Sequence, residues 1–196
     1  MNYLEHIGKY FLMLSRVFRK PQRSKVFYQA FMKEVEDLGL KSLGIIMFIS
    51  FFIGGVIALQ TALNLENPFI PKSLVGFAAK RSIILEFAPT FCSIILAGKV
   101  GSYITSSIGT MRVTEQIDAL EVMGINSLNH LVLPKILATV FFYPFLISLG
   151  MFLGIFGGWT AGVLSGLFNG ADYIEGIQLD FKPFLLVYAI NCLKMS

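Results

Sequence analysis

Charged and chemically reactive side chains are scarce in this sequence. Only 14% of its 196 residues are Asp, Glu, Lys or Arg, whereas an ordinary soluble domain has about 25%. It has two cysteines and two histidines. Cys92 and Cys192 both lie in apolar runs, with neither the spacing of a metal site nor that of a disulfide framework. So low a charge excludes a chain that covers its surface with polar groups in water.

The sequence also lacks the common signatures of catalysis and of nucleotide binding. It contains no HExxH, no GxSxG and no G-x-x-x-x-G-K-[ST] motif. We therefore predict that the chain is not an enzyme, that it holds no cofactor or metal, and that any ATP is bound by a partner subunit. A membrane channel and a non-transporting anchor or assembly subunit stay open as alternatives, although no ring-forming charged filter is recognisable.

Apolar residues make up most of what is present. Hydrophobic residues account for 55% of the sequence, and the mean hydropathy is +0.71. The chain has 19 phenylalanines and 18 glycines, which suit lipid-facing positions and close helix packing in membranes. This composition predicts an all-α polytopic membrane protein with about four transmembrane helices and no sizeable soluble domain.

Positive charges are concentrated at the N-terminal end. Eight of the sixteen Lys and Arg residues lie in 1–41, so the positive-inside rule places this end in the cytoplasm. Apolar residues at helical spacing over 3–18 predict an amphipathic helix that lies in the headgroup plane. We therefore divide the chain into a cytoplasmic-side interfacial region, 1–41, and a membrane domain, 42–196. A nucleic-acid partner is disfavoured, because the basic stretch leads directly into an apolar span.

Three apolar stretches are long enough to cross a bilayer. The first, 43–63, has 21 residues and would rise about 31 Å as a helix. The second, 74–104, is interrupted by charges and by Pro89, and predicts one long, bent helix with its charges near the ends or facing the protein interior. The third, 131–168, is either one long kinked helix or two pieces, and we favour one span with an interfacial start.

The end of the sequence predicts an incomplete fourth span. Asp172, Glu175 and Asp180 indicate an outer loop after the third stretch. The next apolar segment, 184–196, has only 13 residues and is too short to cross a membrane. We expect that this last helix is truncated or is completed by another element.

Glycines recur every four residues in the third apolar stretch. On a helix they would form one slowly wrapping ridge without side chains, which lets a neighbouring backbone approach closely. General tolerance of glycine in membrane helices is the alternative reading. We predict helix packing, with either an internal partner or another subunit, at Gly150, Gly154, Gly158, Gly162 and Gly166.

A short amphipathic helix is predicted at about 114–124, between the second and third stretches. Thr114 is expected to cap its start and Gly124 to end it. Apolar residues at three-residue spacing adjoin an acidic stripe, which suits docking into a groove of a cytoplasmic partner. A solvated helix resting on the headgroups is an equal alternative on this evidence. The apolar positions are Ile117, Leu120 and Met123, and the acidic positions are Glu115, Asp118 and Glu121.

Three ordered motifs around this segment resemble the MlaE (YrbE) family, the permease subunit of MCE-associated ABC lipid transporters. They are E-x-x-P at 86–89, A-G-K-V-G-S at 97–102 and G-T-M-R-V-T-E-Q-I-D-A-L at 109–120, and L-P-K follows at 133–135. The resemblance covers residues 1–196. Many members have Ala-Glu-Leu directly before this third motif, whereas this chain has Ser-Ser-Ile at 106–108. Any role of the family's glutamate therefore cannot be assigned to this chain. Members usually have five spans, one and a half more than are expected here.

The resemblance implies a homodimer of permease subunits in the inner membrane. Cytoplasmic ATPases would drive it, a periplasmic MCE protein would sit on its outer side, and the complex would move phospholipid between the two. The short helix would seat in the ATPase through Glu115, Gln116, Ile117, Asp118, Ala119, Leu120, Glu121 and Met123. Phospholipid would contact Ile57, Gln60, Asn64, Leu65 and Glu86, although Glu86 is equally well read as a wetted interfacial acid.

Overall fold

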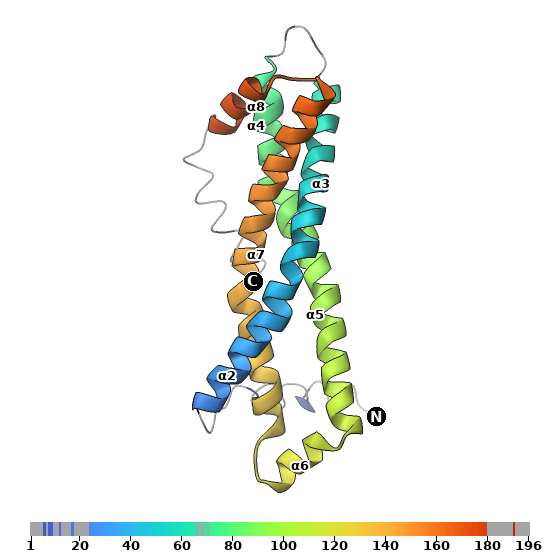
Figure 1. The fold of residues 1–196 in the computed structure, drawn as a ribbon, viewed down its shortest axis with the longest axis vertical. Coiled ribbons are helices and arrows are strands. Elements are labelled where there is room, and N and C mark those ends of the chain that lie inside the picture. Colours follow the sequence, from blue (N-terminus) through green and yellow to red (C-terminus); the bar gives the residue numbers. More distant parts are fainter. Residues whose placement is uncertain are drawn as a thin grey trace. The chain divides into compact units, whose positions relative to one another are not determined.

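The computed structural model describes residues 24–65 and 71–179, together with the single positions His6, Gly8, Lys9, Leu12, Val17, Asn67, Phe69 and Ile190. These residues form helices, turns and short connections, and no strand occurs among them (Figure 1). Three of the helical runs are long and apolar enough to cross a membrane. The prediction of an all-α polytopic membrane protein is therefore confirmed. Most of the predicted interfacial helix, and also Asp180, Cys192 and the predicted fourth span except for Ile190, lie outside the described residues.

The first long helical run contains the first predicted span. It consists of α2 (Ser24–Glu34), the π-helix η1 (Val35–Leu40) and α3 (Lys41–Asn64), and 40 of its residues, Lys25–Asn64, form one candidate membrane span. No charged residue lies within 42–65, so this part of the helix can enter hydrocarbon without exposing a charge. Near its end the Thr61 hydroxyl donates to the carbonyl of Ile57 over 2.7 Å, which satisfies the polar group within the helix.

The second run is also continuous, as predicted. It consists of α4 (Ser73–Ser82), the π-helix η2 (Ile83–Phe87) and α5 (Ala88–Val113), together 41 residues. Pro89 gives the physical reason for η2. Proline lacks an N–H and its ring crowds the carbonyl four residues back, which here belongs to Leu85 inside the widened turn. Of the interrupting charges, Lys80 is buried, whereas Arg81 and Glu86 are exposed.

The third run is a single helix, which decides between the two alternatives in favour of one span. Helix α7 (Ser127–Ser165) has 39 residues and a length of about 58 Å, and it passes through Pro134 and Pro144 without a break. The Ser148 hydroxyl donates to the Pro144 carbonyl over 2.6 Å. The helix ends at Gly166, whose φ of +71° is in the left-handed region that glycine adopts at little cost.

A short helix, α8 (Gly170–Gln178), lies in the segment that the sequence predicted as an outer loop. A helix of nine residues is marginal in water by its own propensity. Here it is stabilised by packing on α4, because Tyr173 and Gly176 are buried and a Cβ at either Gly76 or Gly176 would overlap the backbone of the other helix. Sequence periodicity over so few residues did not indicate this contact.

The described chain forms two compact units. One unit contains Met1–Lys41 and Gly98–Phe142, and the other contains Ser42–Ala97 and Tyr143–Ser196. The first unit includes η1, α6 and the ends of α5 and α7 that adjoin α6, whereas the second includes the glycine-rich part of α7 and the pair α4 and α8.

Candidate functional site

A short helix, α6 (Gln116–Val122), connects α5 to α7. Glu115 precedes it with φ 56° and ψ 15°, a left-handed conformation that costs free energy for a residue with a side chain. Thr114 does not cap α6, contrary to the prediction. Its hydroxyl instead donates to the carbonyl of Thr110 over 2.8 Å and so closes the end of α5. The strained turn at Glu115 separates the two helices.

Gly124 ends α6 with a paired hydrogen-bond arrangement. Its N–H donates to the carbonyl of Glu121 over 2.9 Å, and the N–H of Ile125 donates to the carbonyl of Leu120 over 3.0 Å. This closing motif needs a positive φ at the glycine, which is +71° here. In addition, the Glu121 carboxylate accepts a hydrogen bond of 3.0 Å from the Ser127 hydroxyl, which joins α6 to the first residue of α7.

The outer surface of α6 is acidic, with apolar side chains among the acids. Ile117 and Leu120 are half-buried, whereas Val122 is 89% exposed. Val113, at the end of α5, is 84% exposed. The sequence analysis missed both valines, because they do not follow the three-residue apolar spacing. Exposed side chains among the predicted coupling residues are Glu115, Gln116, Asp118, Ala119, Glu121 and Met123.

This surface has the composition of a protein-docking helix. Exposed apolar side chains gain free energy when a partner buries them, and acidic neighbours select a partner with a basic rim. If α6 instead rested on a membrane surface, its acidic side chains would lie beside anionic lipid headgroups, which carry charge of the same sign. The exposed apolar and acidic residues therefore favour a protein groove over a membrane surface as the partner of α6.

A cleft lies in the second unit between α3, the junction of η2 with α5, and α7. It encloses about 220 Å³, its open mouth included. Ser50 contributes the only side-chain hydroxyl among the lining residues, so the cleft offers an almost entirely apolar surface. The lining residues are Ser50, Ile53, Gly54, Ile57, Ile83, Phe87, Ala88, Phe91, Gly150 and Gly154.

The predicted lipid-contact residues do not gather in one place. Ile57 lines the cleft and is 8% exposed. Gln60 and Asn64 are exposed on the last turns of α3, Leu65 is half-buried just after it, and Glu86 is exposed in η2. The sequence analysis missed the other lining residues, since the cleft is formed where glycines of two distant helices leave space.

Glycines bring the backbones of α3 and α7 into near contact. A Cβ at Gly54 would overlap the backbone of Gly154, and a Cβ at Gly157 would overlap the backbone of Phe51. At Gly158 a Cβ would lie 3.1 Å from the Ala58 Cβ and 2.5 Å from the Tyr173 hydroxyl oxygen. The partner of these α7 glycines is therefore helix α3 of the same chain, one of the two alternatives left open by the sequence.

The other predicted ridge glycines have different surroundings. A Cβ at Gly150 would lie 2.9 Å from the Cys92 Sγ, and one at Gly162 would overlap the ring of Phe168. Gly166 lies beyond the end of α7 and is exposed, with open space where a Cβ would stand. It serves the turn after α7 and is not part of the packed ridge, because the left-handed backbone at this position ends the helix.

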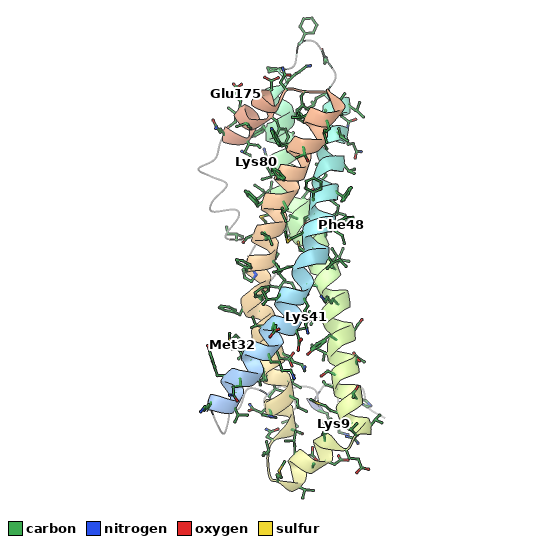
Figure 2. All side chains as sticks on the ribbon, in the orientation of Figure 1. Lys9, Met32, Lys41, Phe48, Lys80 and Glu175 are labelled. Carbon is green, nitrogen blue, oxygen red and sulfur yellow. The ribbon has the colours of Figure 1, made fainter. Side chains whose placement is uncertain are left out.

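A buried lysine joins α4 to the end of α8 in the second unit (Figure 2). Lys80 is 1% exposed, and its ammonium group donates to the carbonyls of Ile177 over 3.0 Å and Leu179 over 2.5 Å. It also lies 5.2 Å from the centre of the Phe77 ring. A cation at these carbonyls satisfies polar groups that a helix C-terminus leaves unpaired. Nearby on α8, burial raises the pKa of the Tyr173 phenol.

Comparison with known proteins identifies the chain's relatives. The family model described as Permease MlaE matches residues 31–193. The chain belongs to the MlaE permease family. The matched residues of this MlaE permease include the first long helical run from residue 31 onward, the whole of the second and third runs, and both α6 and α8.

Several curated relatives of this MlaE family member are permeases by name. A probable ABC transporter permease protein of Rickettsia bellii is 32% identical over 91% of this chain and 69% of its own length. The intermembrane phospholipid transport system permease protein MlaE of Haemophilus influenzae is 34% identical over 78% of this chain and 58% of its own length. Protein TRIGALACTOSYLDIACYLGLYCEROL 1, chloroplastic, of Arabidopsis thaliana is 31% identical over 63% of this chain and 35% of its own length. The chain thus spans about two thirds of the length of the Rickettsia relative and less of the others.

Proposed function

We propose that this chain is the membrane permease of an ABC transporter for phospholipid, driven by a separate ATPase that docks on α6. Helix α6 carries this proposal, because it exposes acidic and apolar side chains between two candidate membrane spans. The family membership and the names of its relatives support the same function. A passive channel would not require an exposed docking helix of this composition.

Reversing the charge of Asp118 and Glu121 tests the docking. The double variant D118K/E121K should lose most of its ATPase, because like charges at a basic groove cost several kcal/mol. The measurement is the amount of ATPase that co-purifies with the permease from detergent-solubilised membranes. Glu175→Lys on α8 is the matched charge reversal and should retain the wild-type amount, since Glu175 is exposed on a helix of the other unit. Equal recovery of ATPase with the double variant would contradict the proposal.

We further propose that the cleft in the second unit receives part of a phospholipid acyl chain. Its almost entirely apolar lining matches hydrocarbon, which gains free energy when it leaves water for such a surface. Ile57 is the residue that both the family resemblance and the cleft include. Gln60, Asn64, Leu65 and Glu86 are proposed to contact the remainder of the lipid, as the resemblance implies.

Filling the cleft tests this assignment. Ile57→Phe should lower the amount of co-purified phospholipid at least about threefold. This change equals roughly the free energy gained by burying one methylene group. Lipid bound per mole of protein is measured by mass spectrometry after size-exclusion chromatography, which also confirms that the variant is folded. Val56→Phe is the matched control, because Val56 is its neighbour on α3 but is 60% exposed and does not line the cleft. Wild-type lipid content in the Ile57 variant would reject the assignment.

The assembly that we propose is a homodimer in the inner membrane with a periplasmic MCE protein, as the family resemblance implies. The N-terminus and α6 would face the cytoplasm, consistent with the basic residues in 1–41. Native mass spectrometry of the purified complex tests the assembly: two permease and two ATPase subunits with an MCE protein are expected. A monomeric permease without these partners would reject it.

A further inference from the structure

Six polar side chains from three helical segments lie around the π-helix η1 in the first unit. Glu34, Asp37 and Lys41 belong to the first helical run, Lys99 and Tyr103 to α5, and Lys135 to α7. They lie within the long helical runs that include the candidate spans. Ionisable groups in such helices are costly unless they pair with each other or with backbone carbonyls.

The start of η1 is held by Lys135. Its ammonium nitrogen lies 2.5 Å from Oε1 of Glu34, the residue directly before η1. The side chain of Lys135 is 3% exposed and that of Glu34 is 14% exposed, so the ion pair is largely removed from solvent. The same ammonium lies 4.7 Å from the centre of the Tyr103 ring, at a distance typical of a cation–π contact. One lysine of α7 thus contacts both the first helical run and α5.

The end of η1 is held by α5. Lys41 directly follows η1, and its carbonyl accepts a hydrogen bond of 2.6 Å from the ammonium of Lys99. The ammonium of Lys41 forms an ion pair with Asp37, one turn earlier. The other carboxylate oxygen of Asp37 accepts a hydrogen bond of 3.2 Å from the Tyr103 hydroxyl. Figure 2 labels Lys41 at the junction of η1 with α3.

Between these two ends, η1 lies directly against α7. A Cβ at Gly39 would lie 2.5–2.7 Å from ring carbons of Phe142, so the glycine permits the contact. A π-helix has poorer hydrogen-bond geometry than an α-helix and persists where surrounding contacts favour it. Here the contacts include two lysines from the A-G-K-V-G-S and L-P-K motifs, which the docking surface of α6 does not use.

We propose that Lys99 and Lys135 are positioning residues that clamp the two ends of η1 to α5 and α7. Helix α6 connects these same two helices, so a displacement of α6 moves both lysines and is passed to η1 and to α3, which continues from it. The inference rests on the proposed function, because it needs an ATPase that displaces α6. A packed element with two lysine contacts can change position as a unit, which is the physical requirement for such transmission.

Hydrogen–deuterium exchange in nanodiscs tests the clamp. Without nucleotide, amides of 35–41 should exchange about tenfold faster in Lys135→Met and Lys99→Met than in the wild type, because their local opening becomes easier. With the ATPase and a non-hydrolysable ATP analogue, exchange in 35–41 should change in the wild type and not in these variants. Lys25→Met removes an exposed lysine of α2 and should behave as the wild type in both measurements. Lys135→Arg keeps the charge and should restore the nucleotide response.

Lipid transfer per ATP hydrolysed provides the functional measurement. The two methionine variants should lose at least about fivefold in this ratio while they retain the wild-type amount of bound ATPase. A lower yield of complex with an unchanged ratio would show a purely structural role and would overturn the inference, as would wild-type exchange in 35–41 of both variants. If the wild-type complex transfers no lipid, the proposed function is wrong. The nucleotide-dependent amide exchange of 35–41 then still shows whether the two lysines transmit a displacement of α6 to η1.

Discussion

Replacement of Gly54 by leucine is expected to prevent α3 and α7 from packing at their native distance. A Cβ at Gly54 would overlap the backbone of Gly154, and a backbone cannot rotate away as a flexible side chain can. Overpacking of this kind costs about 1–3 kcal/mol and occasionally more. At about 2–4 °C per kcal/mol for a chain of this size, the upper end of this cost corresponds to a fall in melting temperature of about 6–12 °C. The expected result is therefore a large loss of thermal stability and of correctly assembled protein.

A matched glycine on the same helix provides the control. Gly44 is exposed, with open space where a Cβ would stand, so Gly44→Leu should keep the wild-type melting temperature to within about 2 °C. Both variants are compared by thermal unfolding in detergent and by the monodisperse fraction in size-exclusion chromatography. Equal stability of the two leucine variants would show that the close approach of α3 to α7 does not stabilise the native protein.

Replacement of Lys80 by methionine is expected to release α8 from α4. The ammonium group satisfies the carbonyls of Ile177 and Leu179, and methionine retains the length of the stem but donates no hydrogen bond. Each of the two hydrogen bonds to the charged group contributes about 1.5–3 kcal/mol. Because methionine also removes the desolvation cost of the buried charge, the local stability of α8 should fall by a smaller net amount, about 2–4 kcal/mol. Amide exchange in 170–178 should accelerate by at least about thirtyfold.

Lys72 provides the comparison for this variant. It is exposed, and its ammonium lies 3.4 Å from the carbonyl of Leu167, a long and solvent-accessible contact. Lys72→Met should change the exchange of α8 by less than about threefold, as is typical of exposed interactions. Unchanged protection of α8 in Lys80→Met would show that the contacts of Tyr173 and Gly176 with α4 hold the helix without the buried charge.

The membrane spans were predictable because hydropathy and chain length act locally. The uncharged stretch 43–63 lies within α3, and the interrupted stretch 74–104 is one continuous run, as its length indicated. Pro89 marks a π-helix there, and Pro144 lies within an unbroken α7. A proline changes the hydrogen bonds of its own turn, but neighbouring contacts decide whether the helix stops.

The glycines show what periodicity cannot decide. Gly154 and Gly158 pack tightly, whereas Gly166, with the same four-residue spacing, ends the helix. Gly157 packs as closely although it does not share that spacing. A glycine's own chemistry allows either close packing or a positive φ, and only the position of the neighbouring helix selects between them.

Some features of α6 depend only on nearby residues and were predictable, whereas others were not. Gly124 ends the helix through hydrogen bonds within five residues of itself, so the sequence was sufficient to predict its role. Thr114 had two local choices, and its hydroxyl bonds to the preceding helix instead of capping the next one. Val122 is 89% exposed in the folded chain, which no pattern within the segment indicates.

The sequence by itself determined the class of this protein: a low content of charge and long apolar stretches require membrane helices, and ordered motifs identify the MlaE permease family. Only the tertiary structure decided which polar groups meet. Glu34 and Lys135 are 101 positions apart and Lys80 is 97 positions from Ile177, yet both lysines are buried against their partners. Local sequence sets the helices through hydropathy and backbone hydrogen bonding, whereas contacts between distant segments depend on how those helices pack.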